Sequence, residues 1–304
     1  MTQLDVIGFG ALNVDKLYKV NRIAKAEEES FIQEQDEACG GSAANTIVGL
    51  ARLGCRVGFI GKTGFDRESE MQIKEFRKEG VNTEGIVRSE SGKSGSVMCF
   101  VDRKGQRALY INPGLNDTIG SSSVKLDYAS NTQFLHLTSF VGDMPLRAQK
   151  KLLGLLPKEV KISFDPGDLY SRRGMVQLEP FIRRAFVVMP NSAELTLLTG
   201  ETDYSKGADI LIEKGARIVA VKLGRRGCYV TDGQERNVLD AFEADVVDTT
   251  GAGDAFCAGF LYGLLNRKDL YDCGRLGNFV ASMKVTKMGA REGLPYKTEL
   301  KLLG

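Results

Sequence analysis

Short runs of apolar and β-branched residues alternate along the chain with longer segments in which apolar residues recur every three or four positions. The short runs predict strands, at Leu4–Gly10, Val57–Ile60, Phe134–Thr138, Lys161–Asp165, Phe186–Met189, Ile218–Lys222 and Gly227–Thr231. The periodic segments predict helices, at Ser42–Leu53, Ser69–Glu79, Pro145–Leu156, Ala193–Leu198, Ala208–Lys214, Ala255–Asn266 and Leu270–Lys287. This alternation is typical of a mostly parallel sheet with helices on both faces. We therefore expect a single α/β domain over residues 1–304.

Two segments interrupt the alternation. Residues 15–38 are polar with short apolar groups, and residues 94–112 contain two strand-like runs, Ser96–Asp102 and Arg107–Ile111, around Arg103-Lys104-Gly105. The second segment has the pattern of a β-hairpin. We expect the two segments to form a small sheet that projects from the main domain and acts as a lid.

Composition and charge narrow the class of protein. Hydrophobic residues make up 42% and charged residues 26% of the 304 positions, which is ordinary for a globular protein. The chain has 41 basic and 39 acidic residues, so its charge favours neither nucleic acid nor a membrane surface as partner. We find no signal-peptide pattern and no apolar run that approaches the ~18 residues of a membrane span, so we expect a cytoplasmic protein. The six cysteines are scattered, which predicts buried free thiols rather than a zinc site.

A glycine-rich loop, Asp248-Thr249-Thr250-Gly251-Ala252-Gly253-Asp254, stands between the strand-like Ala244–Val247 and the next predicted helix. Gly251 and Gly253 would let the main chain approach a ligand closely, and a helix N-terminus offers free N–H groups and a positive dipole end. Such a loop can bind the charge that develops on a transferred phosphoryl group. Asp254 could accept a proton from a hydroxyl group there. The alternative is that Asp254 only caps the helix.

A second glycine-rich stretch, Gly40-Gly41-Ser42-Ala43-Ala44-Asn45, begins the first predicted helix. Its paired glycines permit a tight approach of the main chain, and the Asn45 amide offers both a donor and an acceptor to a polyol. The alternative is a plain helix start with Ser42 as its cap. Asn13 and Asp15 follow the first strand, and Asp15 can accept hydrogen bonds from two hydroxyl groups. In an open α/β sheet, ligands bind beyond the carboxyl ends of the strands, where these residues lie.

Together these motifs resemble the ribokinase family of carbohydrate kinases, also called the pfkB family. The run Asp248–Asp254 with Ala255-Phe256 looks like its C-terminal motif, and Gly40–Asn45 looks like its acceptor-binding motif. The resemblance implies a ribokinase-like fold and a kinase that transfers phosphate from ATP to an alcohol group. It implies that Asp254 is the general base and that the amides of Gly251, Ala252 and Gly253 stabilise the developing charge. It assigns acceptor binding to Asn13, Asp15, Gly40, Gly41 and Asn45.

The resemblance extends to the nucleotide and metal sites. Asn191-Ser192-Ala193-Glu194 matches an Asn-x-x-Glu element of the family, although the same spacing also describes a helix-capping box. The resemblance assigns nucleotide binding to Asn191, Glu194, Lys222, Gly224, Gly227 and Asn278. It places Mg²⁺ near Glu194, through bound water. It also places a monovalent cation such as K⁺ at Asp248 and Thr250, with the segment Val285–Glu292.

The acceptor is less closely defined by the sequence. Asn13, Asp15 and Asn45 are neutral or negative, which suits an uncharged polyol, and the Gly-Gly region lacks the lysine that phosphosugar kinases of the family often place there. The segment Asn112–Asp117 resembles ribokinase and fructokinase, whereas Ser163–Gly167 resembles nucleoside kinases of the same family. We expect a small sugar, with a nucleoside as the alternative. An exposed lid edge could also pair two copies in a homodimer.

Overall fold

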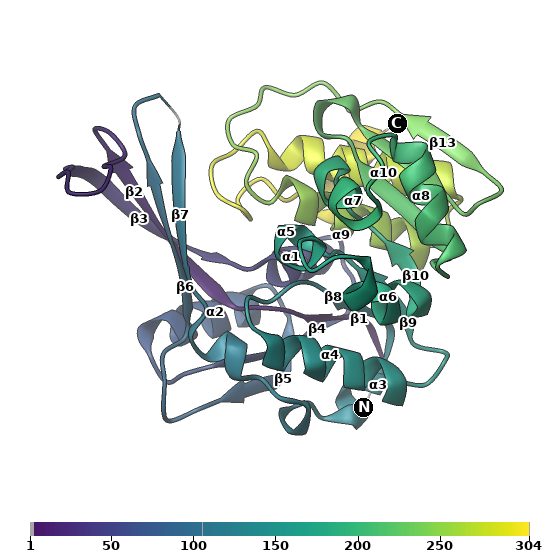
Figure 1. Cartoon of the computed structure of the whole chain (residues 1–304), viewed down its shortest axis with the longest axis horizontal. Helices are drawn as coiled ribbons and strands as arrows, with labels where there is room; N and C mark the ends of the chain where they lie inside the picture. The colour runs from purple at the N-terminus through teal and green to yellow at the C-terminus, as the bar shows by residue number, and fades with distance from the viewer. Residues whose placement is uncertain (1–2, 105, 304) are drawn as a thin grey trace.

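The computed structural model describes residues 3–104 and 106–303, whose strands form two separate sheets; Gly105 of the expected hairpin turn lies outside them. In the described chain the larger sheet has nine strands, and Figure 1 shows it running between layers of helices. In spatial order its strands are β13 (Arg236–Leu239), β12 (Cys228–Thr231), β11 (Ile218–Lys222), β10 (Ala185–Val188), β9 (Lys161–Phe164), β8 (Thr132–Leu137), β1 (Leu4–Phe9), β4 (Val57–Thr63) and β5 (Asn82–Arg88). All neighbours are parallel except β11–β12 and β12–β13. The expected mostly parallel sheet is confirmed.

Helices cover both faces of this sheet. They are α1 (Ser42–Arg52), α2 (Arg67–Lys78), α3 (Leu126–Ser130), α4 (Asp143–Leu155), α5 (Gly167–Ser171), α6 (Met175–Arg184), α7 (Ser192–Thr199), α8 (Tyr204–Glu213), α9 (Ala252–Leu265) and α10 (Leu270–Lys284). One buried cluster includes Ile7 of β1 and residues of α4, α6, α7 and α8. The other includes Val6 of β1 and residues of α1, α2, α9 and α10. Because neighbouring residues of a strand point to opposite faces, the two clusters lie on opposite sides of the sheet. Burial on both faces explains the continuous apolar sequence of the central strands.

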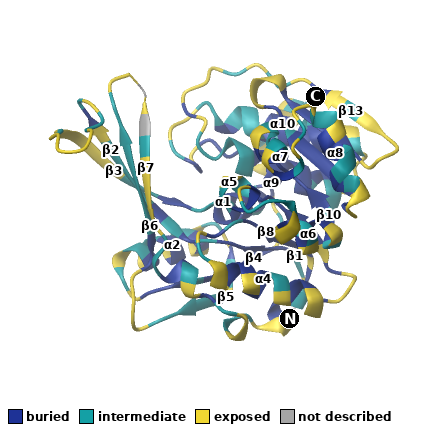
Figure 2. Cartoon of the chain, in the orientation of Figure 1, coloured by how far each residue is buried: buried dark blue, intermediate teal, exposed yellow. Residues whose placement is uncertain are grey.

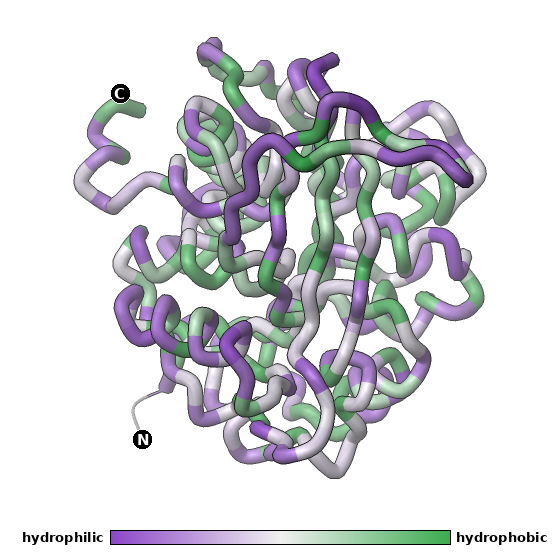
Figure 3. Tube along the Cα trace, turned by 90° about the vertical axis from the view of Figure 1, so that its left-hand side faces the viewer, coloured by the Kyte–Doolittle hydropathy of each residue, from purple (hydrophilic) through white to green (hydrophobic). Residues whose placement is uncertain are grey.

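The smaller sheet projects from this body, as Figure 1 shows. Its strand order is β3 (Ile32–Gly40), β2 (Asn13–Val20), β6 (Gly95–Val101) and β7 (Arg107–Asn112). It is mixed, because β2 and β6 are parallel while the two outer pairs are antiparallel. Figure 2 shows that most of it is partly or fully exposed, and Figure 3 shows hydrophobic and hydrophilic residues side by side along its strands. The two segments that interrupt the sequence pattern thus form one sheet.

The residue register places the base of the small sheet beside the main one. Asn13 follows β1 after a short connection and pairs with Gly40 on one side and with Gly95 on the other. Gly40 in turn leads directly into α1. Two of the sequence motifs are therefore neighbours at the junction between the sheets.

Several sequence predictions were wrong in detail. Ala244–Val247 is not a strand, and Val246 and Val247 are largely exposed. α10 ends at Lys284 rather than Lys287, and α9 begins at Ala252 rather than Ala255. Strands β5 and β13 and helix α6 were not predicted. The earlier start of α9 matters for function, because it moves Gly253 and Asp254 into the first helical turn.

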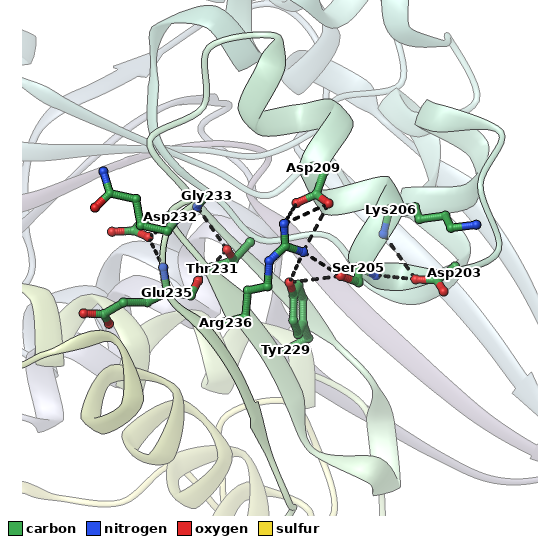
Figure 4. Close-up of polar contacts among 11 residues, drawn as sticks. Asp203, Ser205, Lys206, Asp209, Tyr229, Thr231, Asp232, Gly233, Glu235 and Arg236 are labelled. Atoms are coloured by element: carbon green, nitrogen blue, oxygen red, sulfur yellow. Dashed lines mark hydrogen bonds and ion pairs between the residues drawn. The ribbon is translucent and has the colours of Figure 1, made fainter.

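The unpredicted strand β13 is attached to α8 by a polar cluster, shown in Figure 4. Arg236 donates to Asp209 Oδ2 from both terminal nitrogens at 3.1 Å, and it also contacts the Tyr229 hydroxyl. In the turn that precedes β13, Asp232 Oδ1 accepts from the main-chain N–H groups of Gln234 and Glu235. These contacts attach the last strand of the sheet through partly exposed charged side chains. Each contact contributes only a modest stabilising energy.

The sequence also led to expectations about membrane-spanning helices and about the cysteines. None of the helices in them is long and apolar enough to cross a membrane. Of the six cysteines, which were expected to be buried thiols, four are buried: Cys39, Cys228, Cys257 and Cys273. Cys55 and Cys99 are partly exposed, so the prediction of buried thiols was wrong for these two.

Candidate active site

The glycine-rich loop at residues 248–254 meets the start of helix α1. Asp254 Oδ1 accepts a hydrogen bond from the Ser42 hydroxyl at 2.7 Å, and Oδ2 accepts one from Asn45 Nδ2 at 2.8 Å. Ser42 and Asp254 are 212 positions apart in the sequence. The N-caps of α1 and α9 are Gly41 and Gly251, so neither Ser42 nor Asp254 acts as a helix cap. The two glycine-rich motifs therefore build one site around a single carboxylate.

The environment of Asp254 makes it a better base than an exposed aspartate. Burial raises its pKa to about 6, although the hydrogen bonds from Asn45 and Ser42 act in the opposite direction. A carboxylate with this pKa is still ionised at neutral pH, and it accepts a proton more readily than one with the ordinary value near ~4. The site thus holds an oriented carboxylate with a raised proton affinity.

Arg291 holds in place the Asn45 side chain that donates to Asp254. Its side chain is only 3% exposed, and its Nε donates to Asn45 Oδ1 at 2.8 Å. Its other nitrogens bond to the carbonyl of Gly40 at 3.1 Å and pair with Glu75 at 3.1 Å. Both ends of the Asn45 amide therefore make a hydrogen bond within the protein, and its Nδ2 orients the Asp254 carboxylate. The sequence pattern did not reveal Arg291, because a single arginine in a loop carries no spacing signal.

The residues expected to bind the acceptor lie near the Asp254 carboxylate. Asn116 Nδ2 donates to Asn13 Oδ1 at 2.8 Å, which fixes the orientation of the Asn13 amide. Gly40 lies so close to Asp15 that a Cβ atom at this position would overlap its carboxyl group. Burial raises the pKa of Asp15 to about 6, and the Asp254 carboxylate contributes in the same direction. The electrostatic effect of Asp254 on Asp15 indicates that the two carboxylates share one site.

The N-terminus of α9 provides the expected anion-binding turn. Gly251 has a φ of 76°, in the left-handed region, and a Cβ atom on it would come within 2.8 Å of the Ala290 carbonyl oxygen. The Ala252 amide donates to the Thr249 carbonyl at 3.1 Å and so closes the turn. Since the first N–H groups of a helix have no partner inside it, the amides of Gly251 and Gly253 are better candidates for anion binding than that of Ala252.

A cavity of about 450 Å³ opens beside this turn. Its lining includes Lys222, Gly224, Gly227, Ala252, Gly253 and Asn278, together with apolar residues such as Phe242 and Val246. These include four of the residues that the sequence assigned to the nucleotide. Asn278 Nδ2 donates to the carbonyls of Leu239 and Asp240 at 3.2 and 3.0 Å, so its amide nitrogen holds the wall of the cavity in place.

Lys222, which lines this cavity, forms a buried ion pair. Its Nζ lies 2.7 Å from Asp165 Oδ2, and the two side chains are 12% and 6% exposed. Burial alone would lower the pKa of Lys222, but the charge of Asp165 dominates and raises it above the ordinary value. A Cβ atom on Gly253 would lie 3.4 Å from Lys222 Nζ, so the ammonium group is next to the anion-binding turn. The sequence missed Asp165 as a site residue.

Asn191 and Glu194 lie outside the lining of the cavity but are connected to it. They form a capping box at the start of α7, with Asn191 Oδ1 accepting from the Glu194 amide at 2.9 Å and Glu194 Oε2 from the Asn191 amide at 2.8 Å. Asn191 also bridges to Lys222 through the main chain. The alternative interpretation of this motif, a helix-capping box, is therefore confirmed. The capping role does not prevent Glu194 from having a second role.

The surroundings of Glu194 are compatible with a magnesium ion held through water. Burial and the charge of Asp165 raise the pKa of Glu194 to about 7. Asp165 Oδ1 is buried and has no hydrogen-bond partner among the described residues. No group of three or more histidine, cysteine or acidic side chains forms a direct metal cage in residues 3–104 and 106–303. Carboxylate oxygens with bound water suit Mg²⁺, so these two residues fit the ion that the sequence pattern implies.

The residues expected to bind a monovalent cation also come together. Asp248 Oδ1 accepts from the amide and the hydroxyl of Thr250 at 3.0 and 2.7 Å, and Oδ2 accepts from the Gly289 amide at 2.9 Å. Loop 285–291 thus packs against the glycine-rich loop. The ammonium group of Lys284 lies among the same groups, which the sequence did not predict.

Comparison with known proteins connects this geometry to a family. The family model described as pfkB family carbohydrate kinase matches residues 3–297. An uncharacterized sugar kinase of Archaeoglobus fulgidus is 45% identical over 251 residues, which cover 82% of this chain and 98% of that protein. The ATP-dependent ribose-1-phosphate kinase of Halopiger xanaduensis is 33% identical over 287 residues, 94% of this chain and 93% of that protein. The crystal structure of ribokinase from Thermotoga maritima has a TM-score of 0.87 at 26% identity and covers 99% of both chains.

Proposed function

The chain belongs to the pfkB family of carbohydrate kinases, and on that premise we propose that it transfers the γ-phosphoryl group of ATP to a hydroxyl group of a small, uncharged sugar. The observation that carries this proposal is the pair of hydrogen bonds from Ser42 and Asn45 to Asp254. They hold a carboxylate with a raised pKa between the acceptor residues and an anion-binding helix N-terminus.

In this proposal Asp254 accepts the proton of the sugar hydroxyl while the hydroxyl oxygen forms a bond to the γ-phosphorus of ATP. The bond from that phosphorus to the β,γ-bridging oxygen breaks, and ADP leaves. The amides of Gly251 and Gly253 and the dipole of α9 stabilise the charge that develops on the transferred group. Lys222 contributes a positive charge to the lining of the nucleotide cavity. Magnesium, held through water near Glu194 and Asp165, would neutralise charge on the phosphates.

A sugar fits the acceptor side of the site better than a nucleoside does. Among the aromatic residues that could stack on a base, Phe140 is 1% exposed and packs on Phe9. Phe100 stacks on Tyr18 with ring centroids 5.0 Å apart and packs edge-on against Tyr110 at 5.9 Å. Because these rings already pack against other aromatic rings, their arrangement supports a structural role rather than recognition of a base.

An uncharged acceptor fits better than a phosphorylated one. A phosphate group placed near the base would meet the negative charges of Asp15 and Asp254, and the charge of Asp254 already contributes to the raised pKa of Asp15. Arg291, the basic residue beneath this site, is committed to Asn45, Gly40 and Glu75. The relative from Halopiger is named for a phosphorylated sugar, so this part of the proposal needs a direct test.

The test is a panel of acceptors with MgATP, monitored as acceptor-dependent formation of ADP. The panel contains ribose, fructose, 2-keto-3-deoxygluconate, ribose 1-phosphate, adenosine, cytidine and inosine. We expect turnover with an uncharged sugar, and kcat/KM at least about tenfold higher for it than for ribose 1-phosphate or any nucleoside, a difference of about 1.4 kcal/mol in transition-state binding. A preference for ribose 1-phosphate would reject the uncharged acceptor but keep the kinase. A preference for a nucleoside would establish the alternative.

We further propose that the small sheet acts as a lid and joins two copies of the chain in a homodimer. Ile32, Leu109, Tyr110 and Ile111 of its strands are between 46% and 59% exposed, and its outer strands β3 and β7 leave unpaired edges. An exposed apolar edge of this kind is a liability in a monomer. Sedimentation at micromolar concentration should give twice the chain mass of 33.2 kDa, and should revert toward 33.2 kDa when Leu109 and Ile111 are both replaced by Lys. A wild-type protein that sediments as a monomer would reject the dimer.

A further inference from the structure

Helix α10 ends in a lysine that is completely enclosed by protein. Lys284 has an exposure of 0%, which is rare for an ammonium group unless it is well paired. Its Nζ donates to the main-chain carbonyl of Asp248 at 2.9 Å and to that of Lys287 at 3.3 Å. Asp248 is the first residue of the glycine-rich loop, so this side chain joins the end of α10 to the loop that forms the anion-binding turn.

The Lys284 ammonium group lies among the oxygen atoms that would coordinate a monovalent cation. Such a site was expected at Asp248, Thr250 and residues 285–292, and would consist largely of main-chain carbonyl oxygens. The Asp248 and Lys287 carbonyls accept from Lys284, while the Val285 carbonyl accepts from the amides of Val247 and Asp248 at 2.8 and 3.1 Å. A K⁺ ion bound to these carbonyl oxygens would have to compete with the N–H groups that already donate to them. It would also be repelled by the charge of the Lys284 ammonium group.

Both oxygens of the Asp248 carboxylate in this cluster also accept hydrogen bonds from the protein, namely from Thr250 and Gly289. Burial alone would raise its pKa, but these hydrogen bonds and the charge of Lys284 outweigh burial and lower it. A carboxylate that is already compensated by an internal cation offers little to a second one. The residues present therefore do not fit a bound monovalent cation.

We propose that Lys284 is a built-in cation, which holds the glycine-rich loop in its anion-binding shape and makes the protein independent of K⁺ and Na⁺. Lys284 is a positioning residue in this scheme, because it acts through the Asp248 carbonyl and touches no reacting atom. Loop 285–291 supports the turn directly, since Ala290 lies against Gly251. The effect on turnover rests on the proposed kinase activity, whereas the effect on stability does not.

The test compares unfolding temperature and turnover in chloride salts of K⁺, Na⁺ and tetramethylammonium at the same ionic strength, about 0.1 M. Tetramethylammonium is too large for a carbonyl site and serves as the reference cation. For the wild-type protein we expect the same Tm and the same kcat in all three salts. A Tm and a rate that rise with K⁺ would overturn the inference without any variant, and Tm reports on it even if no sugar in the panel is phosphorylated.

Two variants make the test specific. Lys284→Ala opens space among the carbonyls, and we expect its Tm in tetramethylammonium to fall by about 5 °C and to recover partly in K⁺. Lys284→Met removes the charge but fills the space, so it should lose stability without recovery in K⁺. Lys301→Ala, at an exposed lysine, is the control and should behave like the wild type. If a folded Lys284→Ala protein were as insensitive to K⁺ as the wild type, the inference would be wrong.

Discussion

Replacing Asp254 by Asn should lower kcat by roughly 10²–10⁴-fold, because the substitution keeps the shape of the side chain and removes the proton acceptor. The variant should still bind nucleotide, since Lys222 and the walls of the cavity are unchanged. Turnover is measured with the best acceptor of the panel, and the unfolding temperature of each protein shows that the fold is intact. Asp127→Asn, at an exposed aspartate of α3, is the matched control and should retain full activity. Near wild-type turnover in a folded Asp254→Asn protein would show that another group takes the proton.

The same assignment predicts an acid limb in the pH profile. Burial raises the pKa of Asp254 to about 6, so the carboxylate is the base above that pH and becomes protonated below it. We expect kcat to fall as pH decreases through about 6. Because Asp15 also has a pKa of about 6 and is influenced by Asp254, the limb belongs to the pair. It should persist in Asp15→Asn, whatever that change does to KM. Constant activity down to pH 4.5 in a protein that remains folded would contradict the assignment.

The second large effect is expected from Gly251→Ala, which should reduce kcat by roughly 10²–10³-fold, comparable to the loss of one oxyanion donor. Gly251 adopts a φ of 76°, which alanine disfavours, and the added Cβ would lie 2.8 Å from the carbonyl oxygen and 3.0 Å from the Cα of Ala290. Both atoms are main chain and cannot rotate away, so the turn has to move. The amides of Gly251 and Gly253 would then no longer converge on the transferred phosphoryl group.

A matched glycine separates backbone strain from the loss of the anion-binding turn. Gly200 ends α7 with a φ of 79°, and a Cβ atom on it would meet nothing within 4 Å. Gly200→Ala should therefore cost stability, about 1 kcal/mol, and leave turnover unchanged. Equal losses of kcat in the two variants would mean that the effect of Gly251→Ala is general strain, and the proposed role of the turn would fail.

The sequence predicted the centre of the fold better than its edges. The seven strands predicted from the alternation with helices all exist in the main sheet, and the two that were missed from it, β5 and β13, are its outermost strands. Edge strands are covered on fewer sides and so carry polar residues, such as Glu84 in β5 and Arg236 in β13, which interrupt the apolar pattern. Helix α6 was missed for a related reason, because it begins after Gly174 and contains Pro180, both of which normally indicate the end of a helix.

The apolar run Ala244–Val247 shows how a binding surface can imitate a strand. Ala244 and Val246 line the cavity beside Lys222 and Gly253, so their apolar character serves a pocket rather than a sheet. The converse error concerns charged residues in loops and at helix ends. Arg291 and Lys284 are 3% and 0% exposed, but their partners, Asn45 and Asp248, lie 246 and 36 positions away. No local pattern signals such contacts, because they depend on how distant loops pack.

The motifs themselves could be located from the sequence, while the division of labour within them could not. Gly40–Asn45 and Asp248–Asp254 meet as the resemblance implied, but each end of the Asn45 amide already makes a hydrogen bond within the protein, one with Arg291 and one with Asp254. Spacing identifies which side chains gather at one end of a sheet. It does not show which of their hydrogen-bonding groups remain available to a ligand, since that depends on each partner.

Phosphorus-31 NMR can show whether Asp254 supports phosphoryl transfer to a sugar, because it observes the phosphorylated product rather than the consumption of ATP. Wild-type protein and Asp254→Asn are incubated in parallel with MgATP and the preferred sugar. We expect a phosphate-ester signal that grows with the ADP signals in the wild type, requires the sugar, and forms roughly 10²–10⁴ times more slowly in the variant. Formation of the ester at the same rate in both proteins would contradict the role of Asp254 as the base. Formation of inorganic phosphate alone in the wild type would contradict phosphoryl transfer to the sugar.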